Sequence, residues 1–163
     1  SRAFVNEDNA AAQADQPVER QVSVQPNYVT PSGLTQLQAK VAELQTLLGE
    51  LNALGELADK QREADLQRDL RYFNQRLQSA QVVTPASSTT KVQIGSRVTF
   101  ADEHSHEQTV QLVGEDQADA AAGLINWSSP LGRALLGAQL GDEVLWQRPA
   151  GDQLIEIIRI QPA

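Results

Sequence analysis

The most constraining feature of this sequence is a series of apolar residues that advances in steps of three and four and then recurs in mirror order. Such spacing places one apolar stripe along each of two helices. Two mirrored stripes match position by position when a chain folds back on itself, so the pattern predicts an antiparallel helical hairpin. Pairing the stripes sets the fold-back point near residues 58 and 59. The members are Leu34, Leu37, Val41, Leu44, Leu48 and Leu51, then Leu66, Leu70, Phe73, Leu77 and Ala80.

Capping residues and prolines mark the two ends of the hairpin. Thr30 can cap free helical amides, and Pro31 suits the first helical position, where its missing N–H is no loss. The stripe ends after Ala80, and a polar stretch that contains Pro85 follows. We therefore divide the chain into a flexible tail, a hairpin with its tip near residues 55–61, a linker and a globular domain. These parts are residues 1–27, 28–83, 84–90 and 91–163.

The globular domain contains short β-rich runs separated by turn residues. A short helical stretch, residues 131–137, follows Ser128-Ser129-Pro130, and Pro149-Ala150-Gly151-Asp152 forms a strong hairpin turn. Together with the hairpin, these elements predict an α+β fold: a coiled-coil helical hairpin followed by a small antiparallel β domain with one short helix. The runs are residues 97–100, 108–113, 124–127, 144–147 and 154–160.

The net charge of the chain limits the classes of molecule that it can bind. With 13 basic and 21 acidic residues, the chain has a formal net charge of −8. Autonomous binding to nucleic acid needs a surplus of Lys and Arg, so we expect protein partners instead. Because the mirrored stripe is satisfied within one chain, we expect a monomer.

The sequence contains no cysteine, which excludes disulfides and thiolate metal sites and fits a reducing compartment. No apolar run approaches the length of a membrane span, and the first residues lack a signal-peptide core. We expect a cytoplasmic protein without membrane association.

Two histidines and two tryptophans invite functional readings. His104 and His106 resemble a metal pair, but the sequence offers no cysteine or further histidine to complete a closed site, so a solvated turn is predicted. Trp127 and Trp146, lone aromatics in β-rich runs, are expected to pack in the core or at its rim. No Gly-rich phosphate loop or Ser/His/Asp arrangement indicates a self-contained active site.

Two stretches resemble the GreA/GreB family of bacterial transcription elongation factors. Residues 28–34, Tyr-Val-Thr-Pro-Ser-Gly-Leu, are similar to the start of the family's hairpin, and residues 124–137, Leu-Ile-Asn-Trp-Ser-Ser-Pro-Leu-Gly-Arg-Ala-Leu-Leu-Gly, are similar to its carboxyl-terminal domain. Gly141-Asp142-Glu143-Val144 and Pro149-Ala150-Gly151 continue the match. The resemblance implies an FKBP-like domain that docks on bacterial RNA polymerase and a coiled-coil arm that enters its secondary channel, and hence a regulator of elongation.

The resemblance also implies a role for acids at the tip. In the family, tip acids help hold a catalytic Mg²⁺ in the polymerase's own active site, where backtracked transcripts are cleaved. Glu56 and Asp59 occupy the two acidic places here, with the acid types exchanged, and Lys60 and Arg62 follow. The chain is thus expected to be a non-catalytic regulator that holds no metal or cofactor in isolation. The arm, about 33 Å long at ~1.5 Å per residue, is short for the family, as in Rnk-type polymerase-binding proteins that occupy the channel without stimulating cleavage.

By the same resemblance, the polymerase-docking surface falls on Asn126, Ser128, Ser129, Pro130 and Arg133. Of the family's Ser, Asp and Pro at this surface only Pro130 is unchanged, and Ser128 lacks the family's charge. For Ser129 a simpler role, capping the short helix, is an equal alternative.

An alternative of a different class is an FKBP-type prolyl isomerase or chaperone. Such enzymes need an aromatic-lined pocket, and residues 91–163 contain only Phe100, Trp127 and Trp146 as aromatic residues.

Overall fold

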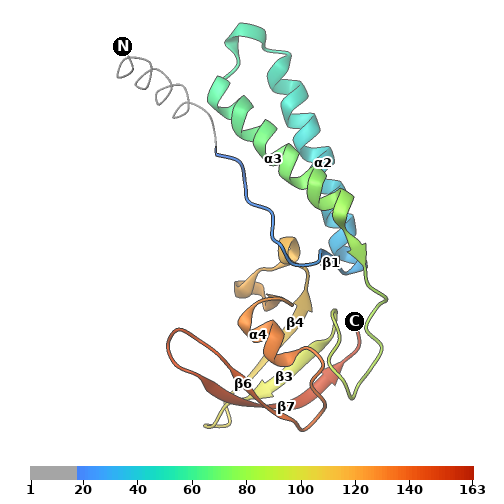
Figure 1. Ribbon diagram of the computed structural model, residues 1–163. Coiled ribbons are helices and arrows are strands. Elements are labelled where there is room, and N and C mark those ends of the chain that lie inside the picture. Colours follow the sequence, from blue (N-terminus) through green and yellow to red (C-terminus); the bar gives the residue numbers. More distant parts are fainter. Residues whose placement is uncertain (1–17) are drawn as a thin grey trace. The chain divides into compact units, whose positions relative to one another are not determined.

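The structure is a computed structural model in which residues 18–163 are described; residues 1–17, most of the predicted tail, lie outside the described part. By its internal contacts the described chain forms two compact units (Figure 1). The arm unit comprises residues 18–24 and 37–78. The globular unit comprises residues 25–36 and 79–163.

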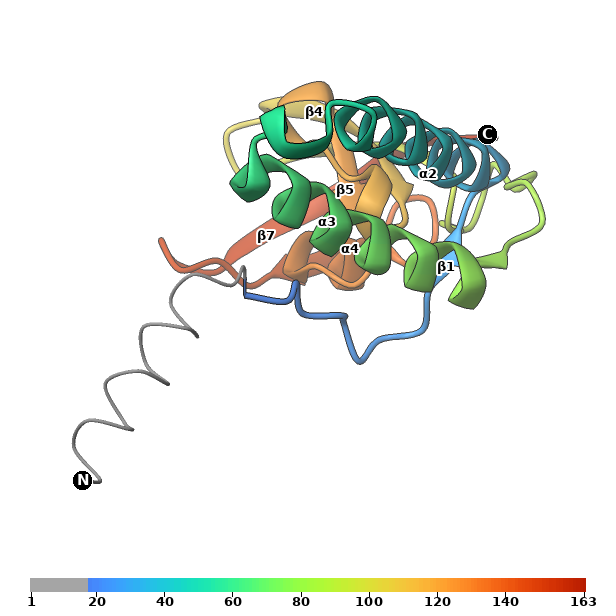
Figure 2. The same ribbon diagram turned by 90° about the horizontal axis from the view of Figure 1, so that it is seen from above.

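The predicted helical hairpin is confirmed. Helix α2 (Pro31–Asn52) and helix α3 (Lys60–Ser79) lie side by side in both ribbon views (Figures 1 and 2). Six side chains of the predicted stripe, three from each helix, meet in one buried cluster of the arm, as expected for two amphipathic helices packed together. The buried cluster of the arm consists of Leu44, Leu51, Ala58 and Leu66, with Leu47, Leu48, Leu70 and Phe73 packed against it.

The turn of the hairpin differs slightly from the prediction. The chain reverses over residues 53–59, which include the 3₁₀ turn η1 (Gly55–Leu57), so the fold-back point near residues 58 and 59 falls at the end of this loop. Ala58 is 7% exposed and belongs to the buried cluster of the arm. Its side chain thus already packs on the seam, so the reversal of the chain lies before residue 58.

The globular unit contains the predicted strands and short helix. Its five-stranded sheet has the order β5-β4-β3-β7-β6, and α4 (Pro130–Leu135) contacts β5 and β6. The predicted fold class holds, with one difference: β5 runs parallel to β4, whereas the other pairs are antiparallel. Two 3₁₀ turns between these strands, η2 (Glu115–Gln117) and η3 (Ala120–Ala122), carry the chain back. The strands are β3 (Arg97–Ala101), β4 (Glu107–Val113), β5 (Leu124–Asn126), β6 (Glu143–Trp146) and β7 (Gln153–Gln161).

The core of the globular unit lies between the sheet and α4. Alternate residues of the strands point inward, as expected for a sheet with one buried face. Trp146 packs at the edge of this core, with its ring 6.2 Å from that of Phe100. The buried members are Val92, Val98, Phe100, Val110, Leu112, Leu131, Leu135, Ala138, Ile155, Ile157 and Ile160.

The first turn of α2 belongs to the globular unit. As predicted, the helix begins at Pro31, and Thr30 caps it, because its Oγ1 accepts the N–H of Gly33 at 3.0 Å. The same hydroxyl donates to Gln117 Oε1 at 2.7 Å. Just before the helix, β1 (Tyr28–Val29) pairs in parallel with β2 (Gln81–Val82), so the two ends of the hairpin meet.

A short segment before β1 packs on α3 and was not predicted from the sequence. We call residues 18–24 the clasp. Glu19 accepts hydrogen bonds from the Arg71 guanidinium, with Nε 3.1 Å from Oε1. The guanidinium of Arg20 lies 4.0 Å from the ring centroid of Tyr72 and 3.4 Å from a carboxylate oxygen of Asp69. Within residues 18–163, none of the helices has the length and apolar character needed to cross a membrane.

Candidate functional site

The loop that carries the predicted docking residues is held by its own side chains. Asn126 Oδ1 accepts the N–H of Ser128 at 3.0 Å and its hydroxyl at 3.1 Å. Ser129 caps α4: its Oγ accepts the N–H of Gly132 at 3.2 Å and donates to the Asn126 carbonyl at 2.7 Å. Asn126 and Ser129 therefore shape the loop, and for Ser129 the geometry shows the capping role.

Three of the predicted residues come together on one surface hollow. Ser128, Pro130 and Arg133 line a cavity of about 500 Å³ beside α4. Arg133 is exposed, and no ion-pair partner is found for it in the described part of the chain. The hollow therefore combines the apolar ring of Pro130 with the exposed guanidinium of Arg133. This combination suits a partner surface that carries a carboxylate. We call this cavity the α4–β6 hollow.

The remaining lining of the hollow was not predicted. It comes from Leu145 on strand β6, Gln147 just after that strand, and Ala134 on α4. Leu145 is 48% exposed, although it stands within a β-rich run whose neighbour Trp146 packs against the core. An apolar side chain on the outward face of an edge strand was the available signal, because alternation assigns Leu145 to the solvent side.

Gly132 lets α4 approach the loop closely. A β-carbon at this position would lie 2.2 Å from the Asn126 carbonyl oxygen and 2.5 Å from that of Trp127. Real atoms do not approach so closely, so only glycine allows this contact. The position of the α4–β6 hollow thus depends on residue 132 being a glycine. Trp127 itself is half-buried and packs against Tyr28, with ring centroids 5.3 Å apart and the ring planes tilted by 55°.

The two tip acids, Glu56 and Asp59, have different environments. Asp59 caps α3: its Oδ1 accepts the N–H groups of Gln61 at 3.0 Å and Arg62 at 3.1 Å. Glu56 lies on the 3₁₀ turn η1, is exposed and has no partner among the described residues. The structure therefore places both acids at the end of the arm, but only Glu56 is unengaged.

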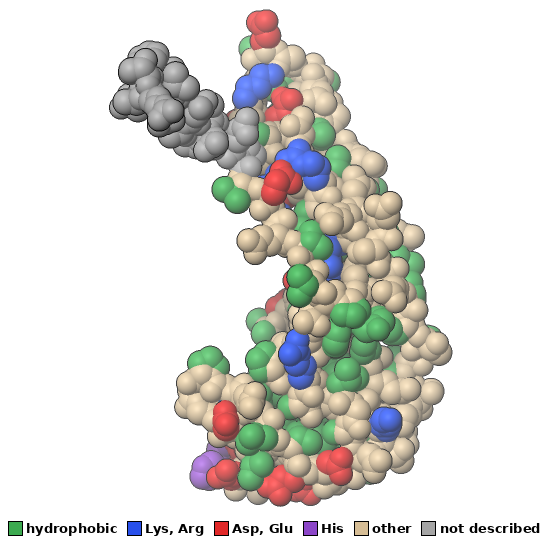
Figure 3. Space-filling view, viewed as in Figure 1, with side chains coloured by type: hydrophobic (Ala, Val, Ile, Leu, Met, Phe, Trp, Pro, Cys, Tyr) green, Lys and Arg blue, Asp and Glu red, His purple; other side chains and the backbone are tan. Residues whose placement is uncertain are grey.

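Two exposed leucines lie next to Glu56 in the sequence. Leu54 is 53% and Leu57 is 88% exposed. The nearby ammonium of Lys60 pairs with Glu63 at 3.5 Å. Figure 3 shows basic and acidic side chains interspersed along the visible face of the arm.

The two histidines lie in the turn between β3 and β4. Asp102 organises this turn, because its Oδ1 accepts the N–H groups of His104 at 2.8 Å and His106 at 2.9 Å. The hydrogen bond from the His106 backbone is the main cause that lowers the pKa of Asp102. The His106 side chain is 80% exposed, and residues 18–163 contain no group of three or more ligating side chains that could hold a metal ion.

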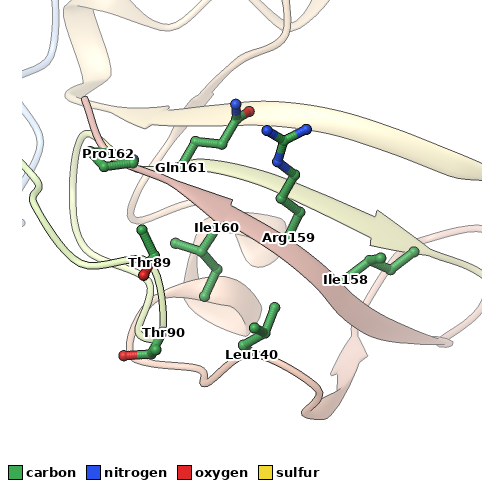
Figure 4. Close-up of a pocket in the computed structure, with 8 residues that line it drawn as sticks. All are labelled: Thr89, Thr90, Leu140, Ile158, Arg159, Ile160, Gln161 and Pro162. Atoms are coloured by element: carbon green, nitrogen blue, oxygen red, sulfur yellow. The ribbon is translucent and has the colours of Figure 1, made fainter.

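Three cavities of the globular unit contain none of the predicted docking residues. One, about 560 Å³, lies beside the end of β7 (Figure 4); Ile160 and Leu140 face its interior, and Arg159 extends away from them. A second, about 250 Å³, is lined by Pro31, Pro85 and Ile94 among others, and the third, about 160 Å³, lies by Phe100 and Trp146 and is lined mainly by polar and charged side chains. A pocket for a proline amide is expected to be apolar and lined by aromatic residues; the first two cavities have no aromatic lining and the third is mainly polar, so none of the three favours the isomerase alternative.

The comparisons with known proteins reported below all match GreA/GreB transcription elongation factors. Residues 87–162 match the family model described as "Transcription elongation factor, GreA/GreB, C-term". Transcription elongation factor GreB of Neisseria meningitidis serogroup B is 33% identical over 152 residues, covering 83% of this chain and 93% of the relative. GreA of Vibrio parahaemolyticus is 37% identical over 135 residues, covering 78% and 86%. Among solved structures, a GreA/GreB factor from Nitrosomonas europaea has 26% identity and a TM-score of 0.41, covering 82% of this chain and 98% of that one.

Proposed function

This chain belongs to the GreA/GreB family of transcription elongation factors, and we propose on that basis that it binds bacterial RNA polymerase and regulates elongation. In this proposal the globular unit docks through the α4–β6 hollow, and the arm enters the secondary channel. The observation that carries it is the hollow itself, which brings Ser128, Pro130 and Arg133 together within the region that matches the family model.

The chemistry of the hollow defines its partner surface. Pro130 and Leu145 offer apolar contact, and Arg133 offers a fork of donors suited to a carboxylate. The whole chain has a net charge of −8. The positive charge of Arg133 is therefore expected to help orient an acidic partner at the hollow. We therefore expect an acidic and partly apolar surface of the polymerase to occupy the hollow.

The arm is proposed to act mainly by occupying the channel. Helix α2 has 22 residues, or about 33 Å at ~1.5 Å per residue. The family resemblance implies arms that are longer by about two to three helical turns per helix. A tip that falls ~10 to 15 Å short of the metal cannot ligate it, because a metal–oxygen bond spans about 2 Å.

The chain supports the polymerase's chemistry rather than performing its own. Any Mg²⁺ in the complex would be held by the polymerase, and Glu56 would add a carboxylate only if the arm reached that metal. Carboxylate oxygens are suitable ligands for such a hard cation.

The docking proposal is tested by measuring the affinity of purified polymerase for the full chain and for the double variant Pro130→Ala/Arg133→Ala. We expect binding to weaken by about tenfold or more, because an apolar contact and a charged hydrogen bond are both lost. Arg159→Ala is the matched control, since Arg159 is an exposed arginine that lines a different cavity. Unchanged binding in the double variant, or an equal loss in the control, would contradict docking through the α4–β6 hollow.

The effect on transcription is tested with stalled polymerase complexes. We expect the full chain to alter elongation, with little stimulation of transcript cleavage. Strong cleavage that disappears in Glu56→Gln would show that the arm reaches the metal and would refute the expectation of channel occupancy.

A further inference from the structure

We propose that α3 carries an arginine-binding site, formed by Asp69, Tyr72 and Phe73, which the clasp fills with Arg20 in the free chain. A basic side chain of the polymerase displaces Arg20 when the arm binds. The clasp is then a competitor that the chain itself supplies. The displacement rests on the proposed function, whereas the filled site within the free chain does not.

Arg20 is held by two aromatic rings and a carboxylate. Its guanidinium carbon lies 4.0 Å from the ring centroid of Tyr72 and 5.0 Å from that of Phe73, within the range of a cation–π interaction. One guanidinium nitrogen lies 3.4 Å from a carboxylate oxygen of Asp69, which also pairs with the neighbouring Arg68 at 3.1 Å. Arginine suits such a site better than lysine does, because its planar guanidinium can cover a ring while its N–H groups reach a carboxylate.

The burial of Tyr72 shows that the site has a cover. Tyr72 is a buried residue of α3, yet it does not belong to the buried cluster between the two helices of the arm. A side chain of a two-helix hairpin that does not face the other helix is open to water unless a further segment covers it. Arg20 lies over the Tyr72 ring and is part of that cover. Without the clasp, α3 would present an aromatic ring beside a carboxylate, and such a surface attracts cations.

The rest of the clasp is held weakly, so the segment can leave the site. Val18 and Val24, at its two ends, are almost fully exposed, and they bury little apolar surface. The ion pair between Glu19 and Arg71 is also exposed, and exposed ion pairs contribute little to stability. Segments with few buried apolar contacts open more readily than the core of a protein.

Beyond the clasp the chain is fixed again. Asn27 Nδ2 donates a hydrogen bond to Ser79 Oγ at 3.1 Å, and the pairing of β1 with β2 follows. The clasp can therefore detach while its connection to the globular unit stays in place. A tethered segment has a high effective concentration at its own site, so weak contacts are sufficient to fill the site until a partner competes.

The chemistry of Arg20 indicates that of the competing group. A site that holds a guanidinium from the clasp can accept one from another protein, and the net charge of −8 favours the approach of a basic surface. The carboxylate of Asp69 disfavours a phosphate at this position. We therefore assign the site to a basic side chain of the polymerase and not to nucleic acid.

The first test follows the clasp in the free full chain. The sequence contains no cysteine, so Val18→Cys provides a single attachment point for a nitroxide label, whose electron paramagnetic resonance lines narrow when the segment becomes mobile. We expect narrow lines in Arg20→Ala and intermediate lines in Arg20→Lys. Arg97→Ala removes an exposed arginine of the globular unit and is the matched control, with an expected spectrum like that of the wild type.

The second test measures the affinity of purified polymerase for the same chains without the label. Apparent affinity scales with the fraction of molecules whose site is open, so Arg20→Ala should bind about threefold to tenfold more tightly than the wild type. Adding Asp69→Asn to Arg20→Ala should remove this gain, because asparagine keeps the size of the side chain but lacks the charge that holds an arginine. The helical circular dichroism signal of each variant verifies that the arm is intact.

Each step of the inference has a result that would overturn it. An unchanged spectrum in Arg20→Ala means that Arg20 does not hold the clasp. A mobile clasp without tighter binding contradicts the competition, and equally tight binding with and without the Asp69 carboxylate contradicts use of the site by the polymerase. If neither the wild type nor any variant binds polymerase, the proposed function fails together with the displacement, while the spectra still decide whether Arg20 fills the site.

Discussion

The buried seam of the arm can be tested by one pair of leucine substitutions. Leu44 is 3% exposed and packs in the cluster with Leu51 and Leu66, whereas Leu57 at the tip is 88% exposed. Leucine-to-alanine changes in protein cores cost about 2–5 kcal/mol, from lost burial and from the cavity left behind. Because the arm is only two helices thick, water can enter the cavity, so we expect the lower part of this range, about 2–3 kcal/mol, for Leu44→Ala.

Urea unfolding of the full chain, followed by far-ultraviolet circular dichroism, measures this cost, since α2 and α3 contain most of the helical residues in the described part of the chain. Leu57→Ala is the matched control and is expected to change the free energy of unfolding by at most about 0.5 kcal/mol. Equal costs at the two positions would refute the assignment of the seam. So would a Leu44→Glu variant with an unchanged helical signal, because an unpaired carboxylate cannot remain in that contact.

Three further predictions concern single contacts. Gly132→Ala should destabilise the globular unit by about 1–3 kcal/mol in thermal unfolding, because its β-carbon would collide with the Asn126 carbonyl oxygen; an unchanged midpoint would argue against this close approach. Gly49→Ala should stabilise the arm by about 0.5–1 kcal/mol, since Gly49 lies inside α2 with open space around it; no gain in denaturant midpoint would contradict this. The hydrogen bond with Arg71 lowers the pKa of Glu19, so the clasp is favoured above the ordinary value of 4.5 and released as the pH falls through the lower folded value. NMR signals of the clasp should report this release, and Glu19→Gln should abolish its pH dependence.

The spacing of apolar residues was sufficient to predict the two helices of the arm, because the position of the turn determines which residues of the seam face each other. The same holds for the start of α2 at Pro31, where the cap and the proline act within a few residues. The strands of the globular unit were likewise readable from short apolar runs between turn residues. These features depend on contacts whose sequence spacing is regular or small.

The remaining features depend on contacts between distant residues, which leave no period in the sequence. The parallel pairing of β5 with β4 depends on the path of the intervening 3₁₀ turns. Leu145 joins Arg133 at one hollow only because β6 lies beside α4. Asp59 and Glu56 look alike in sequence, and only hydrogen-bond geometry separates the cap from the free acid.

The parallel pair of β1 and β2 has a consequence for how such proteins can diversify. The chain leaves the globular unit after Gln36 and returns at Ser79, and strands β1 and β2, which flank the hairpin, are hydrogen-bonded to each other. The intervening segment is therefore an insert with adjoining ends, and the surrounding fold does not dictate its length. Helical turns can be gained or lost in matched pairs while the strand pairing stays intact. The length of the arm can thus change in evolution without a change in the globular unit that carries it.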